Sequence, residues 1–328
     1  MVTASQNDVR AEFHVLRTDC GVYDLDSRAK VMLTGTDRVR WLNGMVTNNV
    51  RDLAPGHGVY AFLLNPQGHI LGDLYAYNRG DSLLVDTEQA QLTKILATFE
   101  HYIIMDDVEV QNVSEKLTGL AISGPRSREV LRKAQFDVPE LEPLQLADLV
   151  WNGISLTLVR GEGDAPPYQI WLSSENATRV HEALINAGAS PVGPEAQELH
   201  RIALGIPRYG QDIRERDLPQ ETEQTRALHF SKGCYIGQEI VERIRSRGNV
   251  HRKFTGFVID GPLPAPGAKI QLDGKDLGEI TSVASIPVEN GERRVALGYI
   301  RREAATPGKI LQAGDAKAIV AELPFAGI

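Results

Sequence analysis

The residue type most suited to covalent chemistry in this sequence is a cysteine, Cys234, within FSKGCYIGQEIVER at 230–243. Gly233 and Gly237 permit tight turns on either side of the thiol, and the residues after Gly237 favour a helix. A cysteine near a helix N-terminus with Lys232 beside it should have more thiolate character, and the thiolate is the reactive form. The alternative is a small buried apolar residue, which is the commonest fate of free cysteine.

The second cysteine, Cys20, has no basic neighbour in the sequence, and we expect it to be structural. The two cysteines lie far apart and form no C-x-x-C or Cys/His cluster, so we expect neither a disulfide framework nor a metal site. Two free thiols fit a reducing, cytoplasmic setting. The N-terminus mixes charges of both signs without a continuous apolar stretch, so we expect no signal peptide and no membrane span.

A basic run follows the cysteine, at 243–253, and has no acidic residue. Its cations are Arg243, Arg245, Arg247, Arg252 and Lys253. The run is either a site for a small anion near Cys234 or a solvated face with salt bridges, and the sequence leaves both open. The net charge of −8 argues against a partner bound through nucleic-acid phosphates.

Short strands and amphipathic helices alternate irregularly before this run. The residue pattern predicts strands at 29–35, 58–65, 154–161 and 168–173. Helices are predicted around 92–103, where apolar residues recur at three- and four-residue steps, at 174–187 with Ser174 as N-cap, and at 194–204.

The character of the chain changes after Arg247, where short strands separated by Gly/Pro turns predict a small barrel or sandwich. The strands are expected at 253–260, 268–272, 277–286 and 295–300. We therefore expect an α+β protein with an α/β region over 1–248 and an all-β domain over 249–328. A length of 328 residues fits two or three domains.

The stretch SKGCYIGQEIVERIRSRGNVHRK resembles the signature of the YgfZ family, folate-binding relatives of the glycine cleavage T-protein that support iron–sulfur proteins. That signature is Lys-Gly-Cys, an aromatic, a variable residue and Gly-Gln-Glu, with an Arg-Gly downstream. Three further segments are similar to T-protein patterns: LLNPQGHILGDLYAY, SGPRSREVL and RIALGIPRYGQDI. The resemblance covers nearly the whole chain and implies a three-part ring with two α/β portions and a C-terminal barrel.

The resemblance also implies residue roles. Asp73 matches the aspartate that faces the reacting nitrogen of tetrahydrofolate, where a carboxylate suits general-base chemistry. Arg201 matches an arginine that holds the folate through its donor fork; alternatively, it is an exposed helical arginine paired with Glu198. Gln169 replaces a pterin-binding glutamate, and an amide still pairs with a pterin edge but carries no charge.

From the same resemblance, Asp73 and Cys234 are the expected catalytic residues. The expected tetrahydrofolate ligands are Asp73, Gln169, Arg201, Lys232, Arg243 and Arg247. The implied function is folate binding in assembly or repair of iron–sulfur clusters in client enzymes. The alternatives are a folate-dependent aminomethyltransferase and a folate-sensing module without chemistry. Two distant cysteines cannot supply the four thiolates of a typical cluster, so any cluster would be shared or transient.

Overall fold

The computed structural model describes residues 8–163, 167–248 and 250–328, apart from the side chain of Arg247. The chain divides into two compact units that are discontinuous in sequence. Unit 1 comprises the described residues up to Leu63, Gly72–Gly193 and Ser231–Tyr235. Unit 2 comprises the described residues of Leu64–Leu71, Pro194–Phe230 and Ile236–Ile328.

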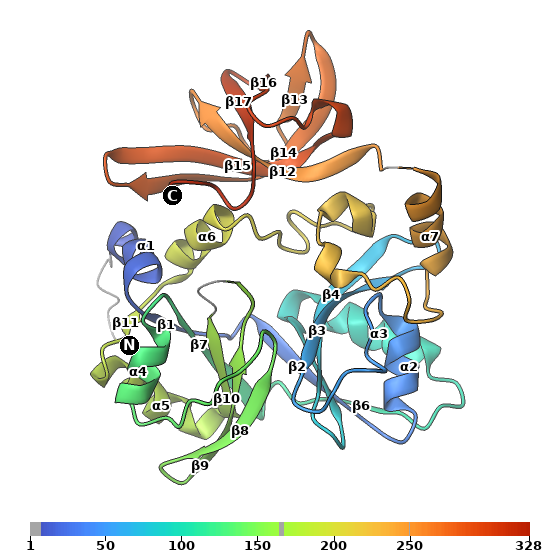
Figure 1. The fold of residues 1–328 in the computed structure, drawn as a ribbon, viewed down its shortest axis with the longest axis vertical. Helices are drawn as coiled ribbons and strands as arrows, with labels where there is room; N and C mark the ends of the chain where they lie inside the picture. The colour runs from blue at the N-terminus through green and yellow to red at the C-terminus, as the bar shows by residue number, and fades with distance from the viewer. Residues whose placement is uncertain (1–7, 164–166, 249) are drawn as a thin grey trace. The chain divides into compact units, whose positions relative to one another are not determined.

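Unit 1 contains two mainly antiparallel sheets with helices, drawn in the lower half of Figure 1. The first sheet has the strand order β3-β4-β5-β2-β6. In that order its strands are Gly58–Leu64, Ile70–Asn78, Leu83–Glu88, Arg28–Thr34 and Glu109–Asn112. Its helices are α2 (Arg38–Met45) and α3 (Leu92–Tyr102), the latter preceded by the 3-10 turn Gln89–Gln91. The helices pack together through an edge-to-face contact of Trp41 and Phe99, with ring centroids 5.1 Å apart.

The second sheet of unit 1 has the strand order β11-β1-β7-β10-β9-β8, and its single parallel pairing joins β11 to β1. In that order its strands are Ser190–Pro191, Gly21–Asp24, Leu117–Ser123, Tyr168–Ser173, Ile154–Arg160 and Leu146–Trp151. Its helices are α1 (Val9–Thr18), α4 (Ser127–Lys133) and α5 (Ala177–Asn186). Cys20 is fully buried in this core, as expected for a structural cysteine.

An apolar cluster joins the two sheets inside unit 1. Its members are Tyr77, Leu84, Leu144, Leu146, Val159 and Trp171. Tyr77 from β4 meets Trp171 from β10 edge to face, with ring centroids 5.0 Å apart. Because strand side chains alternate between faces, Asp73 and Tyr75 lie on the same face of β4 as Tyr77.

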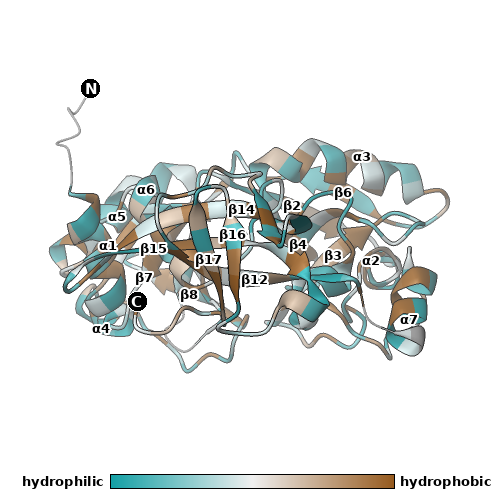
Figure 2. Ribbon diagram, turned by 90° about the horizontal axis from the view of Figure 1, so that it is seen from above, coloured by the Kyte–Doolittle hydropathy of each residue, from teal (hydrophilic) through white to brown (hydrophobic). Residues whose placement is uncertain are grey.

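Unit 2 holds a closed six-stranded barrel in the order β12-β15-β14-β13-β16-β17, drawn at the top of Figure 1. In that order its strands are Arg252–Asp260, Gly291–Arg301, Lys275–Val288, Lys269–Leu272, Ile310–Ala313 and Ala316–Ala321. A 3-10 turn, Arg302–Ala304, follows β15. The remaining helices are α6 (Pro194–Ala203), the 3-10 turns Pro219–Thr222 and Thr225–Ala227, and α7 (Gln238–Arg247), whose ribbon carries both hydrophobic and hydrophilic colours in Figure 2.

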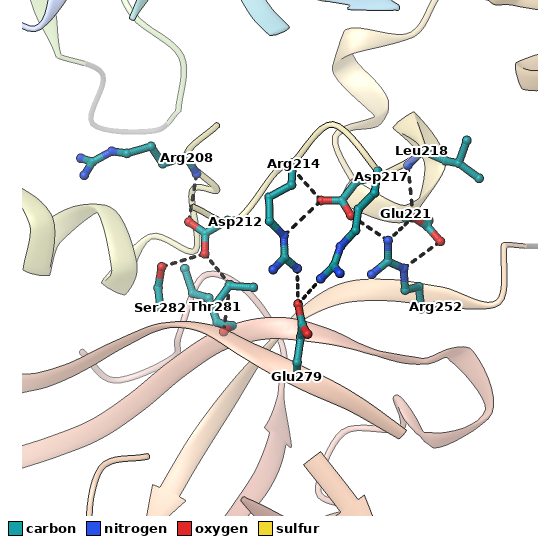
Figure 3. A network of polar contacts seen from close by, with 12 residues as sticks. Arg208, Asp212, Arg214, Asp217, Leu218, Glu221, Arg252, Glu279, Thr281 and Ser282 are labelled. Carbon is teal, nitrogen blue, oxygen red and sulfur yellow. Dashed lines mark hydrogen bonds and ion pairs between the residues drawn. The ribbon is translucent and has the colours of Figure 1, made fainter. Parts of the chain in front are cut away.

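A polar network inside unit 2 joins the segment 208–221 to the barrel (Figure 3). Asp212, fully buried, accepts hydrogen bonds from Thr281 and Ser282 of β14, at 2.5 and 2.7 Å. Glu279 of the same strand pairs with Arg214 and, at 2.6 Å, with Arg216. These bonds fasten the segment to β14.

The predicted α+β fold with a C-terminal barrel is confirmed, and the barrel alternative holds over the sandwich. One helix start was predicted wrongly: α5 begins at Ala177, because Ser174 opens a 3-10 turn (Ser174–Asn176) and its hydroxyl donates to the Glu115 carbonyl at 2.9 Å. The ring-like arrangement of the parts and the boundary near Gly248 stay predictions. No helix in the described parts of the chain is both long and apolar enough to span a membrane.

Candidate functional site

Asp73 lies on β4 with both carboxylate oxygens held by side chains. The Tyr60 hydroxyl on β3 donates to Oδ2 at 2.6 Å, and the Gln91 amide donates to Oδ1 at 2.7 Å. Gln91 is buried, and its carbonyl oxygen accepts the Asp73 backbone N–H at 2.9 Å. The Asp73 side chain is half-buried, so the carboxylate is fixed in position and its remaining lone pairs can accept from an amine.

An aromatic and charged surface continues from Asp73 along the same sheet face. The Tyr75 ring lies 5.0 Å from that of Tyr60, and the Arg28 guanidinium lies 5.8 Å above the Tyr75 ring. Arg28 pairs with Glu88 at 3.2 Å and with Asp86 at 3.0 Å. The Arg28 guanidinium lies over one face of the Tyr75 ring, so a planar ligand that stacks on this ring would use the other face.

Asp86 is fully buried beneath this surface, where it pairs with Arg28 and Lys30. The Lys30 ammonium donates to its Oδ1 at 2.7 Å, and Arg28 bonds the same oxygen. Burial raises the pKa of the Asp86 carboxyl, but the charges of Arg28 and Lys30 lower it by more. The net pKa is therefore below the ordinary value, and the group stays ionised. The pair holds two adjacent strands, β2 and β5, in register.

Gln169 reaches the same cluster from the second sheet. It is half-buried on β10, and its side-chain oxygen accepts the indole N–H of Trp171 at 2.9 Å. The Trp171 ring, fully buried, contacts Tyr77 and lies 5.0 Å below the Lys30 ammonium. A chain of contacts therefore connects Gln169 with the strand that carries Asp73.

Arg201 lies on α6 in unit 2, where protein acceptors take all five of its N–H groups. It donates to both carboxylate oxygens of Glu198 at 2.9 and 2.7 Å, to Asp212 at 2.8 Å, to Ser282 at 3.0 Å and to the Ile206 carbonyl. The fork that we expected a folate to meet is thus filled. The structure corrects the picture of an exposed arginine as well, because its side chain is only 10% exposed.

Lys232 is buried, and its ammonium lies against backbone. It donates to the carbonyl of Asn43 and, at 2.8 Å, to that of Val46, at the C-terminal end of α2. The ring of Tyr235 lies 4.8 Å from the same nitrogen. Burial, and secondarily the charge of Arg51, lower the pKa of Lys232 to about 7. Lys232 therefore fastens the segment Ser231–Tyr235, called the signature loop below, to α2. The role of Lys232 as a folate ligand stays a prediction.

Cys234 is exposed and free, which contradicts the alternative of a buried apolar residue. The surroundings differ from those expected. Helix α7 begins only at Gln238, after Gly237 in the left-handed conformation, so the thiol lies outside its first turn. The ammonium of Lys232 donates to backbone carbonyls and not to the thiol, so Lys232 and Cys234 are close mainly in sequence.

The basic run divides between roles. Arg252 pairs with Asp217 at 2.7 Å and with Glu221 at 2.9 Å inside unit 2 (Figure 3). Arg245 packs on the Phe230 ring at 4.6 Å and pairs with Glu242. Arg243 is exposed on α7, whereas the side chain of Arg247 lies outside the described part of the chain. Arg243 and Arg247 stay predicted folate ligands.

The sequence reasoning missed Tyr60, Tyr75, Gln91 and Arg28. The alternation in DLYAY places Asp73 and Tyr75 on one face of a strand, which was a usable signal for Tyr75. Tyr60 and Gln91 lie 13 and 18 residues from Asp73, and they meet it only through tertiary structure. Across residues 8–163, 167–248 and 250–328, no three His, Cys, Asp or Glu side chains gather as a metal site.

The chain is similar to known proteins along nearly its whole length. The GCVT N-terminal domain matches residues 3–232, and the CAF17 C-terminal beta-barrel domain matches 249–325. The aminomethyltransferase of Geobacillus kaustophilus is 26% identical over 97% of this chain and 90% of its own length. That of Rubrobacter xylanophilus is 28% identical over 97% and 86%.

A solved structure shows the same fold. It is the glycine cleavage system aminomethyltransferase T from Bartonella henselae, with a TM-score of 0.87, 22% identity, and coverage of 97% of this chain and 90% of that one. The domain match spans well over half of the sequence, and the fold agrees along nearly all of it. The chain therefore belongs to the family defined by the GCVT N-terminal domain, and it ends in a barrel of the CAF17 type.

Proposed function

We propose that this protein binds tetrahydrofolate on the sheet face that carries Asp73. The observation that carries the proposal is the half-buried Asp73 carboxylate, fixed by Tyr60 and Gln91 beside the ring of Tyr75. A carboxylate only accepts hydrogen bonds, so it suits the amine of a reduced pterin. Bound tetrahydrofolate supplies a nitrogen that carries one-carbon groups.

The chain's own residues have distinct tasks in this proposal. Asp73 accepts a hydrogen bond or a proton from the ligand amine, Tyr75 offers a stacking face, and the Gln169 amide pairs with a pterin edge. Tyr60 and Gln91 hold the Asp73 oxygens so that little reorganisation accompanies proton transfer.

We further propose a YgfZ-type role in the assembly or repair of iron–sulfur clusters in client enzymes. The support is the Lys-Gly-Cys-Tyr-x-Gly-Gln-Glu signature, the exposed thiol of Cys234, and the match of the C-terminal domain to the CAF17 barrel. An exposed free thiol persists best in a reducing compartment, which supports a cytoplasmic location as part of the same proposal.

A second candidate is a folate-dependent aminomethyltransferase, the activity that names both relatives described above. The ordered Asp73 carboxylate favours it. Turnover of an aminomethylated lipoyl carrier protein with tetrahydrofolate would decide for this candidate. In cells, loss of function on Cys234→Ala but not on Asp73→Asn favours the iron–sulfur role, and the reverse pattern favours aminomethyl transfer.

Calorimetric titration of tetrahydrofolate under reducing conditions tests the shared core of both candidates. We expect the wild type to bind and Asp73→Asn to bind about tenfold more weakly, because one acceptor oxygen becomes a donor facing the ligand amine. Cys234→Ala serves as the control and should bind as the wild type does. A wild type that takes up no folate would end the proposal.

A further inference from the structure

We infer that Gln169 determines ligand specificity by presenting only hydrogen-bond donors, because Trp171 fixes the orientation of its amide. This inference rests on the proposed folate function and deepens it, since it concerns which edge of the ligand the protein selects. It follows from one side-chain hydrogen bond and the packing that holds it.

The hydrogen bond has only one possible polarity. An indole N–H is a donor and never an acceptor, so the atom of Gln169 that lies 2.9 Å from it is the carbonyl oxygen. The two other tryptophans differ in this respect: Trp41 donates to the backbone carbonyl of Tyr102, and Trp151 to that of Ala134. Trp171 alone among the three directs its N–H at a side chain that can turn.

The indole itself has little freedom to move. Trp171 is fully buried, with the Tyr77 ring against its edge and the Lys30 ammonium 5.0 Å from its ring. Lys30 is in turn held by Asp86. Rotating the indole would break the ring contact and the cation–π contact together, each worth roughly 0.5–2 kcal/mol. The immobile indole N–H therefore fixes the orientation of the Gln169 amide.

The amide nitrogen of Gln169 is left for a ligand. Among the described residues, Trp171 is the partner of this side chain, through its oxygen, and the side chain is half-buried. Turning the amide over would place its NH2 against the indole N–H, donor against donor, which is unfavourable in a buried setting. The two N–H donors of the amide therefore have no partner among the described residues and are available to a ligand.

A ligand edge that meets these donors must offer an acceptor. The pterin of a folate has a ring carbonyl, and replacing that carbonyl with an amino group turns the acceptor into a donor. A glutamate in place of Gln169 would present an acceptor and select the opposite kind of edge. The locked amide thus favours the carbonyl form of the ring.

The test compares tetrahydrofolate with its 4-amino analogue, in which the ring carbonyl is replaced by an amino group, by calorimetric titration. We expect the wild type to prefer tetrahydrofolate at least tenfold. Trp171→Phe frees the amide to turn, so its preference should fall to within about threefold. Gln169→Glu should reverse the preference. Thermal unfolding checks that each variant is folded, and the reversal in Gln169→Glu carries the test if Trp171→Phe does not fold.

The possible failures can be told apart. A wild type that binds neither compound defeats the folate proposal itself. A wild type that binds both equally well, or a Trp171→Phe variant that keeps the full preference, overturns the role of the lock while folate binding stands. The lock has a ligand-free readout as well: Gln169→Ala should shift the indole N–H resonance of Trp171, assigned by its loss in Trp171→Phe, and an unmoved resonance would contradict the hydrogen bond.

Discussion

At the scale of single residues, Lys232 has a structural role, whereas its position beside Cys234 in the sequence predicted that it would favour the thiolate. Lys232 precedes Cys234 by two positions, yet its ammonium is buried against the carbonyls of Asn43 and Val46. A charged group in such a place costs free energy unless it is well bonded. The structure therefore identifies Lys232 as the tie that holds the signature loop.

The lowered pKa of Lys232 makes stability depend on pH. The folded pKa is about 7, whereas an unfolded lysine titrates near ~10.4. Between these values the unfolded chain binds more protons, so the free energy of unfolding should rise with pH, by up to ~1.4 kcal/mol per unit. Urea unfolding at a series of pH values between 7 and 10 measures this slope.

Two variants complete that experiment. Lys232→Met removes the titrating group and should flatten the slope, while Lys116→Met, at an exposed position in the turn before β7, should leave it as in the wild type. An equal slope in the wild type and in Lys232→Met would show that other groups cause the pH dependence.

At the scale of elements, two glycines of the signature differ in what surrounds them. Both have positive φ, +98° at Gly233 and +81° at Gly237. A Cβ at Gly237 would lie 2.6 Å from the carbonyl oxygen of Asn65, whereas nothing lies within 4 Å of a Cβ at Gly233. Gly237 thus brings the start of α7 close to the turn between β3 and β4.

Alanine at each position separates backbone strain from this close approach. Gly233→Ala should cost about 1–2 kcal/mol of unfolding free energy, the strain of a left-handed residue. Gly237→Ala adds a clash with backbone and should cost clearly more. Chemical unfolding measures both, and equal losses would mean that the chain accommodates the Cβ at Gly237 without cost.

Much at this scale could be predicted from the sequence, because local patterns reflect burial. The strands β2, β3, β9 and β10 and the helices α3 and α6 agree with their predicted positions. The strand β17 has an alanine-rich sequence with weak strand preference, and it forms by closing the barrel, where it pairs with β12. The Asp73 motif was visible, but its partners depend on tertiary contacts that no local pattern records.

At the scale of the whole molecule, the barrel is tied to a segment that precedes it by many residues. Arg252 pairs with Asp217 and Glu221, and the Phe325 backbone donates to the Ala203 carbonyl at 3.2 Å. The segment 194–230 therefore belongs with the barrel in unit 2. A linear reading of composition cannot find this grouping, because it depends on which polar groups pair after folding.

The isolated fragment 249–328 should consequently be less stable than the barrel in the full chain. It lacks the carboxylates that pair with Arg252 and the Asp212 carboxylate that accepts from Thr281 and Ser282 of β14, so these interactions are lost. Thermal unfolding of the fragment, followed by circular dichroism, measures the loss, with a 194–328 fragment as the matched control. Identical midpoints for the two fragments would show that residues 194–248 do not support the barrel.

The chain passes between the two units five times, at 63/64, 71/72, 193/194, 230/231 and 235/236. During synthesis, unit 1 cannot be completed until Ser231–Tyr235 has left the ribosome, because Lys232 supplies the bonds to Asn43 and Val46. The signature loop is synthesised nearly 200 residues after α2. At a translation rate of about 5–20 residues per second, the delay between the two is roughly 10–40 s. Unit 1 therefore stays incomplete until the signature loop is synthesised, and Cys234 emerges together with Lys232, the residue that completes this unit.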